Sequence, residues 1–535
     1  MAFNSNSYYS NNTTNENTHR RATTTIRQEK GYKIEATSNN NNVDISIQNT
    51  ANAALTSKQS TVSTGYYQDP FLRLFSGASF HPPPKRVRLK SSRMACEPQH
   101  QQPIIRRGTH ARVCCMDRAI SQFLKLTMNR YQQQGKRNYN LPSTTAAAAA
   151  AQIVVLGAGH DTSYLRFRSG LLLDKSCYLY QHENDYVEGN SNKNAMVQWY
   201  EIDHAAVIDS KQRMLQQAHD LVNNNKSNEC LHGNSNGDNI VSTVFSDTEI
   251  NRQKDNSCYF SMSSASCIVN SSSKHQLSEQ YVPSSRCHLM PFDLRNDSKQ
   301  LFLDLVKHCD FDYNVPTLFL MECVMMYFPE ESSQNLLREI TYRIQTPILI
   351  LYDAILLDDP FGETMKQNLN RIHVLAESLC NQTTLLLQLQ KLVNAGGFTT
   401  AVGCDMMNAY DTILTPEQRE WANHCELLDE LEEWVLIMKH YCLVVAVKGS
   451  VEQDVTTETN ESSNIISLAK NFCHIMDNTD QTAVIPKAVA SNIPSSLLSS
   501  SNNTMAANKN EIMSLLSTVS TMGFVRTKCS IQCKE

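Results

Sequence analysis

A glycine-rich turn after an apolar run is the first pattern in the sequence that could do chemistry. Val155-Leu-Gly-Ala-Gly-His-Asp161 continues the β-branched stretch that starts at Ile153. The missing Cβ atoms of Gly157 and Gly159 allow a sharp turn and a close approach of the backbone to a ligand. A histidine and an aspartate stand where the dinucleotide fingerprint would continue to its third glycine, which disfavours a pyrophosphate site. A plain tight turn is the alternative interpretation.

An acidic residue ends the next apolar run. Asp203 closes the strand candidate 200–203, and an acid at this position of a parallel sheet can accept hydrogen bonds from both hydroxyls of a ribose. An Asp before a helix is equally a routine N-cap. The glycine turn and Asp203 together describe half of a nucleoside-binding crevice at the carboxyl ends of parallel strands.

Strands and helices alternate along the part of the chain that must position these residues. The apolar periodicity predicts a helix over 112–128, a final helix over 426–438, and strands at 153–156, 200–203, 318–324, 347–352, 398–402 and 441–448. This alternation predicts an α/β fold with a mainly parallel sheet and helices on both faces.

The composition divides the 535 residues unevenly. Residues 1–53 are rich in Asn and Thr and predict a disordered tail, 54–450 hold most of the apolar sequence, and 451–535 are a low-complexity extension. Two stretches inside the globular part, at about 181–198 and 221–285, are interpreted as low-complexity surface insertions. We therefore expect that a deletion of about 225–280 leaves a folded protein.

Charge and cysteine usage exclude several classes of protein. The net charge is −5 with no long run of one sign, so a general nucleic-acid-binding role has no electrostatic support. The 17 cysteines form no CxxC pair, so no metal site is predicted and buried thiols are favoured. An apolar signal region and a run of membrane-spanning length are absent from the sequence. We expect a cytoplasmic protein, and the basic cluster Lys85, Arg86, Arg88 and Lys90 leaves nuclear import open.

Several segments resemble, in order, those of the leucine carboxyl methyltransferases. They are Thr64-Gly-Tyr-Tyr-Gln-Asp-Pro70, Arg107-Gly-Thr-His-Ala-Arg112, Leu156-Gly-Ala-Gly-His-Asp-Thr162, Tyr200-Glu-Ile-Asp203, Asp293-Leu-Arg295, Pro316-Thr-Leu with Glu322-Cys-Val and Tyr327, Phe361-Gly with Met365 and Asn368-Leu, Asp405-Met-Met407, and His440-Tyr-Cys-Leu443. The resemblance covers about 54–450 apart from the insertions. It implies a Rossmann-like class I S-adenosylmethionine-dependent methyltransferase domain over 54–450.

The resemblance also assigns residues to the cofactor S-adenosylmethionine. It implies that two cations, Lys58 and Arg112, contact the methionine carboxylate. It further implies that Gly157 approaches the cofactor, that Asp203 holds the ribose, and that Asp293 and Leu294 flank the adenine. Glu322 would lie beside the transferable methyl group. A surface charge remains the alternative for Lys58, and a paired buried acid for Glu322. The sequence departs from the family at Thr109-His110 and Tyr164-Leu165, which puts the packing around the site in doubt.

The acceptor that the resemblance implies is the α-carboxylate of the C-terminal leucine of the protein phosphatase 2A catalytic subunit. Such a carboxyl has a pKa of roughly 3.3 to 3.7, so it is anionic near neutrality and needs no general base. Arg295 is the candidate that steers this carboxylate, because a guanidinium can hold it bidentately, and Tyr327 is a candidate neutral donor. A structural ion pair is the alternative for Arg295, and simple packing is the alternative for Tyr327.

Two other functions stay open at this point. The related carboxyl methyltransferase of tRNA wybutosine synthesis shares this catalytic half, but no kelch-like repeat with a period of about 50 residues follows Gly449. A non-catalytic regulator that keeps the fold and binds the phosphatase or the cofactor is the second alternative. We expect a monomer whose partner is the phosphatase, with nucleic acid and membrane disfavoured as partners.

Overall fold

The computed structural model describes ten stretches of the chain. They are residues 50–75, 101–137, 149–180, 196–225, 236–252, 260–273, 276–355, 359–371, 384–448 and 483–486. The predicted tail up to residue 49, the basic cluster at 85–90, residues 181–195 of the first insertion and the C-terminal extension apart from 483–486 lie outside these stretches.

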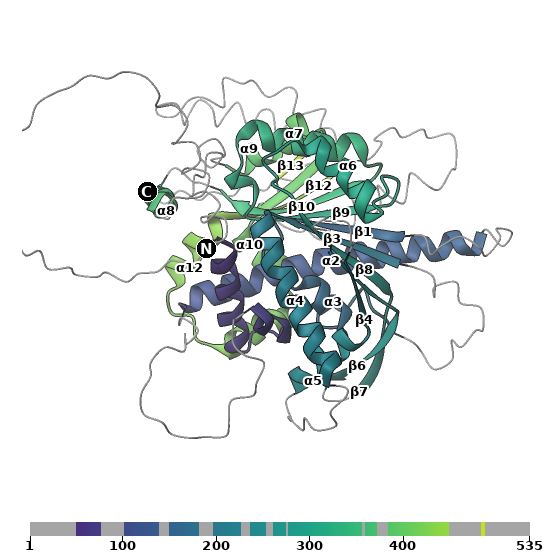
Figure 1. The fold of residues 1–535 in the computed structure, drawn as a ribbon. Helices are drawn as coiled ribbons and strands as arrows, with labels where there is room; N and C mark the ends of the chain where they lie inside the picture. Colours follow the sequence, from purple (N-terminus) through teal and green to yellow (C-terminus); the bar gives the residue numbers. More distant parts are fainter. Residues whose placement is uncertain are drawn as a thin grey trace, which may run out of the picture.

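A ten-stranded sheet forms the centre of the molecule, in the order β13-β11-β12-β10-β9-β1-β3-β8-β5-β4 (Figure 1). The central strands β8, β3, β1, β9 and β10 are parallel, and β12 and β5 pair with the outer two of them in the antiparallel sense. This mixed α/β architecture with a mostly parallel centre confirms the predicted fold class. The strands are β1 Ala149–Leu156, β3 Met196–Asp203, β4 Thr248–Arg252, β5 Phe260–Ser264, β8 Ser284–Pro291, β9 Thr317–Glu322, β10 Pro347–Ala354, β11 Thr400–Asp405, β12 Tyr441–Val447 and β13 Ala483–Pro486.

Helices cover both faces of this sheet because its central strands are apolar on both sides. Along β1, Ile153 and Val155 join one buried apolar cluster, whereas Val154 and Leu156 join the other. Helices α6, α7 and α9 cover one face, while α2, α3, α4 and α5 lie across the other (Figure 1). The helices are α2 Pro103–Arg137, α3 Ser163–Arg168, α4 Ala205–Asn225, α5 Asn236–Ser246, α6 Ser298–Cys309, α7 Glu330–Arg343, α8 Pro360–Arg371, α9 Leu385–Gln390, α10 Met406–Thr412, α11 Pro416–Cys425 and α12 Leu431–Lys439, with shorter turns η1 Pro70–Phe75, η3 Met325–Tyr327 and η5 Lys391–Ala395.

An N-terminal segment, residues 50–75, packs on the sheet without contributing a strand to it. Its backbone is helical over 50–63 and again in η1. Phe71 and Leu72 are 0% and 2% exposed and belong to the larger apolar cluster. This segment is therefore part of the folded core, and its helix begins before residue 54, where we predicted the globular region to start.

Each predicted strand and helix overlaps an observed element of the same type, although the helix predicted over 426–438 begins only at Leu431, as α12. The strand predicted at 398–402 becomes β11, shifted by two residues, and the helix predicted over 112–128 is the middle of the longer α2. Strand β8 was not predicted, because its sequence Ser-Ser-Arg-Cys-His-Leu-Met-Pro mixes polar and apolar residues without clear alternation.

The prediction that 221–285 is wholly a surface insertion is wrong. This stretch contains α5, β4 and β5, together with β6 Cys267–Ser273 and β7 Gln276–Val282, which form a second sheet with β2 Leu179–Tyr180. Phe245 and Phe260 are 0% and 2% exposed, and β5 pairs with β8. The serines of β5 alternate with Phe260 and Met262, so a polar average composition hides a strand with one apolar face.

Two further boundaries differ from the predictions. Residues 196–198, at the end of the first predicted insertion, already belong to β3. Residues 483–486, in the predicted low-complexity extension, pair with β11 at the edge of the main sheet. Within the described stretches, no helix combines the length and the apolar character needed to cross a membrane.

Candidate functional site

Four of the predicted cofactor-binding residues lie at the carboxyl ends of adjacent parallel strands. Gly157 follows β1, Asp203 ends β3, Asp293 follows β8 and Glu322 ends β9. Because the four strands are neighbours in the order β8-β3-β1-β9, these ends share one edge of the sheet. This is the edge at which open α/β sheets bind ligands.

The turn after β1 requires glycine for two reasons. Gly157 has a φ of +70° and Gly159 a φ of +51°, both in the left-handed region that favours glycine. A Cβ on Gly157 would also lie 2.5 Å from Cγ2 of Val324, in the loop after β9. The structure therefore explains Gly157 by a close contact between two strand-end loops as well as by the turn itself.

Asp203 holds this turn in place. Its Oδ2 accepts a hydrogen bond from the Gly159 amide at 2.6 Å, and its Oδ1 accepts one from the His204 amide at 2.6 Å. Burial raises the pKa of Asp203, and the two amides offset part of that rise. Since each carboxylate oxygen has a second lone pair, the group can still accept hydrogen bonds from ligand hydroxyls.

Asp293 and Arg295 form an ion pair within one tight turn after β8. The Arg295 Nε lies 2.8 Å from Asp293 Oδ1, and its Nη2 lies 2.6 Å from Oδ2. Burial opposes ionisation of the acid, but the guanidinium keeps the pKa of Asp293 below its ordinary value. Leu294, between them, is 6% exposed and packs into the second apolar cluster.

Two buried cations reach the same edge from outside the sheet. Lys58, on the helix over 50–63, places its Nζ 2.8 Å from Asp161 Oδ2. Arg112, on α2, places its Nε 3.2 Å from Glu322 Oε2 and its guanidinium 5.5 Å from the centre of the Tyr352 ring. These charged groups are largely buried. Lys58, Asp161 and Arg112 are 6–8% exposed, and the side chain of Glu322 is 18% exposed.

The electrostatics of these groups join them into one cluster. Burial lowers the pKa of Lys58, but Asp161 and Glu322 outweigh it and leave the pKa raised. Burial likewise opposes the charge on Asp161, yet Lys58 and Lys211 bring the pKa of that acid well below its ordinary value. The structure thus brings the two predicted cations together with Glu322, and adds Asp161 as their second acid.

Tyr327 lies in η3, just beyond Glu322. The turn begins with Cys323, a non-glycine residue with a φ of +56°, whose amide donates to the Tyr352 carbonyl at 2.7 Å. Such a backbone conformation is strained and needs surrounding contacts to hold it. Burial raises the pKa of Tyr327 well above its ordinary value, so the phenol is a neutral donor.

Arg295 and Tyr327 follow β8 and β9, two strands that are separated in the sheet by β3 and β1. The loop that carries Arg295 nevertheless reaches α7, because the Ser332 hydroxyl donates to the Arg295 carbonyl at 3.3 Å. Both Nε and Nη2 of Arg295 face Asp293. The geometry therefore favours the structural ion pair over the predicted carboxylate clamp for Arg295.

Comparisons with known proteins agree with this geometry. A family model described as leucine carboxyl methyltransferase matches residues 190–341. A leucine carboxyl methyltransferase 1 homolog from Arabidopsis thaliana is 25% identical over 405 residues, covering 76% of this chain and 90% of that protein. The leucine carboxyl methyltransferase 1 of Emericella nidulans is 25% identical over 429 residues, covering 76% of this chain and 87% of that protein. That of Rattus norvegicus is 31% identical over 177 residues, covering 33% and 52% of the two chains.

Over about three quarters of its length, the chain is therefore similar to leucine carboxyl methyltransferases. This similarity supports a methyltransferase that acts on carboxyl groups, and enzymes of that family generally depend on S-adenosylmethionine. The stretch that the family model matches contains Asp203, Asp293, Glu322 and Tyr327. It does not reach Lys58, Arg112 or Gly157, which the structure places at the same edge.

Sequence patterns did not indicate all the charged residues of this methyltransferase site. Lys211 on α4 lies under the glycine loop, where its Nζ contacts the Asp161 carbonyl and Glu201 Oε2, both at 2.6 Å. Asp69 and Arg166 form a second buried network beside it. Asp69 and Asp161 lie within the quoted motifs. The motifs alone do not predict the distant side chains that pair with these two acids in the fold.

Proposed function

We propose that this carboxyl methyltransferase uses S-adenosylmethionine to methylate the α-carboxylate of the C-terminal leucine of the protein phosphatase 2A catalytic subunit. The observation that carries the proposal is the convergence of two buried cations, Lys58 and Arg112, with the glycine turn and Asp203 at one sheet edge. The family name of the matched proteins supports the leucine carboxylate as the acceptor.

The residues at this edge fit the cofactor by their chemistry. Arg112 Nε is buried and has no hydrogen-bond partner within the described stretches, although Glu322 lies 3.2 Å away as an ion-pair partner. A ligand carboxylate could accept from it, with Lys58 as the second cation. Asp203 would accept from the ribose hydroxyls, while Asp293 and Leu294 would border the adenine.

The chemistry then needs little from the protein besides alignment and the removal of water. When bound, S-adenosylmethionine supplies a methyl group on a positively charged sulfur. The α-carboxyl acceptor, with a pKa of roughly 3.3 to 3.7, is already an anion and needs no base. Tyr327 would donate its phenol hydrogen to one acceptor oxygen and leave the other free to attack.

An aromatic wall beside Tyr327 would exclude water from the acceptor. Tyr352 and Tyr441 stack with ring centres 5.3 Å apart, and both are less than 10% exposed. The Arg112 guanidinium lies over the Tyr352 ring, so its positive charge would also act on the acceptor side of the site. Removing water strengthens each charged contact within the site.

The test is methyl transfer from labelled S-adenosylmethionine to the purified, assembled phosphatase catalytic subunit. We expect a base-labile methyl ester on its C-terminal leucine, and much weaker labelling of the isolated tail peptide, because a docked partner restricts the approach of the carboxylate. A phosphatase lacking the terminal leucine is the matched control. Labelling of tRNA instead would favour the wybutosine pathway enzyme, and cofactor binding with no transfer would favour a non-catalytic regulator.

A further inference from the structure

The N-terminal segment is fixed to the loop after β1 by two successive residues of that loop. Asp161 pairs with Lys58 at 2.8 Å. Its neighbour Thr162 donates its hydroxyl to Asp69 Oδ2 at 2.5 Å. The segment that carries Lys58 is thus held at two points, 11 residues apart in sequence, against the same short loop.

Asp69 is the centre of the second attachment. It is 3% exposed. Its Oδ1 accepts from the amide of Phe71, in the first turn of η1, at 3.1 Å. Its Oδ2 faces both the Thr162 hydroxyl and, at 3.5 Å, the Nε of Arg166. Asp69 therefore joins the N-terminal segment to the glycine loop and to α3.

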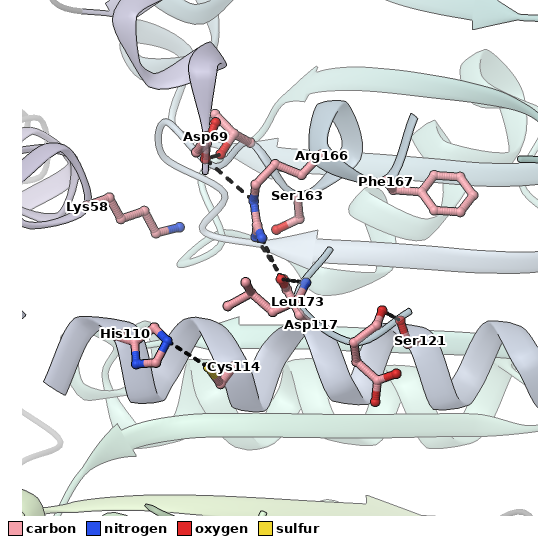
Figure 2. Close-up of polar contacts among 12 residues, drawn as sticks. Lys58, Asp69, His110, Cys114, Asp117, Ser121, Ser163, Arg166, Phe167 and Leu173 are labelled. Carbon is pink, nitrogen blue, oxygen red and sulfur yellow. Dashed lines mark hydrogen bonds and ion pairs between the residues drawn. The ribbon is translucent and has the colours of Figure 1, made fainter. Parts of the chain in front are cut away.

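Arg166 is itself held from the opposite side. Its two terminal nitrogens donate to Asp117 on α2, and Asp117 also accepts from the Leu173 amide at 2.8 Å. Figure 2 shows Arg166 between Asp69 and Asp117, with Lys58 extending toward the same region. The guanidinium is thus a fixed point against which Asp69 can be positioned.

The charges of the two attachments influence each other. Burial raises the pKa of Asp69 to about 6, and Arg166, the Thr162 hydroxyl and Lys58 all oppose that rise. The charge on Lys58 therefore reaches Asp69 as well as Asp161. Tyr67 packs against the same guanidinium, with its ring centre 5.7 Å from the guanidinium carbon of Arg166.

We infer that Asp69 is a positioning residue of the cofactor site, which through Thr162 and Arg166 fixes the N-terminal segment so that Lys58 lies beside the glycine loop. The inference rests on the proposed function, because it takes Lys58 as a contact of the cofactor carboxylate. Asp69 acts through Thr162 and Arg166 and is not itself among the residues assigned to the cofactor. Its loss moves Lys58 rather than removing a ligand contact.

The experiment measures the dissociation constant of S-adenosylmethionine and of S-adenosylhomocysteine for the full chain by calorimetry. Asp69→Asn keeps the size of the side chain and can still accept from the Phe71 amide, but it removes the charge that faces Thr162 and Arg166. We expect both dissociation constants to rise about tenfold, the loss typical of one charge-assisted contact. The kcat at saturating cofactor should stay unchanged, because the reacting atoms are not touched.

Glu426→Gln is the matched control. Glu426 also anchors the N-terminal segment, since Tyr66 donates to it at 2.7 Å, and it pairs with Arg106 on α2. It thus links the segment to α2 and to the chain after α11 and not to the glycine loop. We expect this variant to lower the melting temperature while cofactor affinity stays within about twofold. An equal loss of affinity in both variants would mean that any loosening of the segment suffices, and would overturn the specific role of Asp69.

A double-mutant cycle with Lys58→Gln tests whether Asp69 acts through Lys58. In the Lys58→Gln background, Asp69→Asn should have almost no further effect on affinity. Additive losses, or a folded Asp69→Asn variant with wild-type affinity, would contradict the inference. If Asp69→Asn does not fold, Thr162→Val removes the same contact at nearly constant volume, and the same outcomes apply to it. A wild-type chain that binds neither ligand would instead refute the proposed function.

Discussion

The two sides of the candidate site are built in different ways. The nucleoside side consists of the glycine turn, Asp203 and Asp293, all at strand ends and held by amides or by neighbours in the chain. The carboxylate side consists of Lys58 and Arg112, on helices outside the sheet, with acids far away in sequence; Lys58 and Asp161 are 103 residues apart. The nucleoside side is therefore held mainly by the sheet and its strand-end loops, whereas the carboxylate side depends on how the N-terminal segment and α2 dock onto the sheet.

The largest effect should come from weakening the sheet next to the nucleoside side. Phe260→Ala removes a side chain that is 2% exposed on β5, opposite Leu289 of β8. We expect a loss of about 3–5 kcal/mol in unfolding free energy, the usual result for a buried Phe, in urea denaturation. Ser261→Ala, on the other face of β5, is the control and should change it by less than about 0.5 kcal/mol. If Phe260→Ala lowered the unfolding free energy as little as the control does, β5 would be a surface insertion and not part of the folded core.

On the carboxylate side, Arg112→Ala should have the next largest effect. It removes a cation and leaves Glu322, on β9, without its ion-pair partner. We expect kcat/KM for methyl transfer to fall about a hundredfold, equivalent to the roughly 3 kcal/mol of a charged contact. Arg112→Lys should recover part of the loss, since it restores the charge but not the planar fork. Wild-type kcat/KM in folded Arg112→Ala would exclude Arg112 from the site.

The same difference explains how much of the site the sequence could predict. The glycine turn and Asp203 were predicted from residue type and local pattern, because each directly follows an apolar run that forms a buried parallel strand. Lys58 and Arg112 came only from the family resemblance, since nothing near them in sequence indicates Asp161 or Glu322. The core strand β5 was missed because its composition is polar on average. The spacing of Asp293 and Arg295 in the sequence does not show whether the guanidinium pairs with the acid or is free to bind a ligand.

A pH series tests a buried acid under the acceptor region. Asp353 on β10 is 0% exposed, its Oδ2 has no hydrogen-bond partner within the described stretches, and burial raises its pKa from 3.8 to about 7. Between those two values the folded chain keeps a proton that the unfolded chain releases, so stability falls as the pH rises, by at most about 1.4 kcal/mol per pH unit.

Asp353→Asn cannot ionise and should escape this loss. The unfolding free energy of the variant, relative to wild type, should therefore increase from pH 4 to about 7 and then level off in urea titrations. The other buried acids are common to both proteins and cancel in the difference. Parallel stability curves for the two proteins would show that Asp353 is not held neutral by burial.

The smallest effect is expected for Arg295→Ala. Arg295 and Asp293 are 29% and 26% exposed, and partly exposed ion pairs contribute about 0.2–1 kcal/mol. We expect cofactor affinity to fall at most about fivefold, because Asp293 loses its orienting partner, while the kcat for methyl transfer stays unchanged. A large fall in kcat with unchanged cofactor affinity would instead restore Arg295 as the clamp for the acceptor carboxylate.

The division of the site into two sides is tested most directly by comparing two ligands on two variants. S-adenosylhomocysteine carries the amino-acid carboxylate, whereas methylthioadenosine has the same nucleoside without it. Calorimetry should show that Asp203→Ala weakens both ligands, by roughly 1.5 to 3 kcal/mol. Lys58→Gln should weaken S-adenosylhomocysteine alone. Equal weakening of both ligands by Lys58→Gln, or unchanged binding of methylthioadenosine to a folded Asp203→Ala variant, would contradict the account.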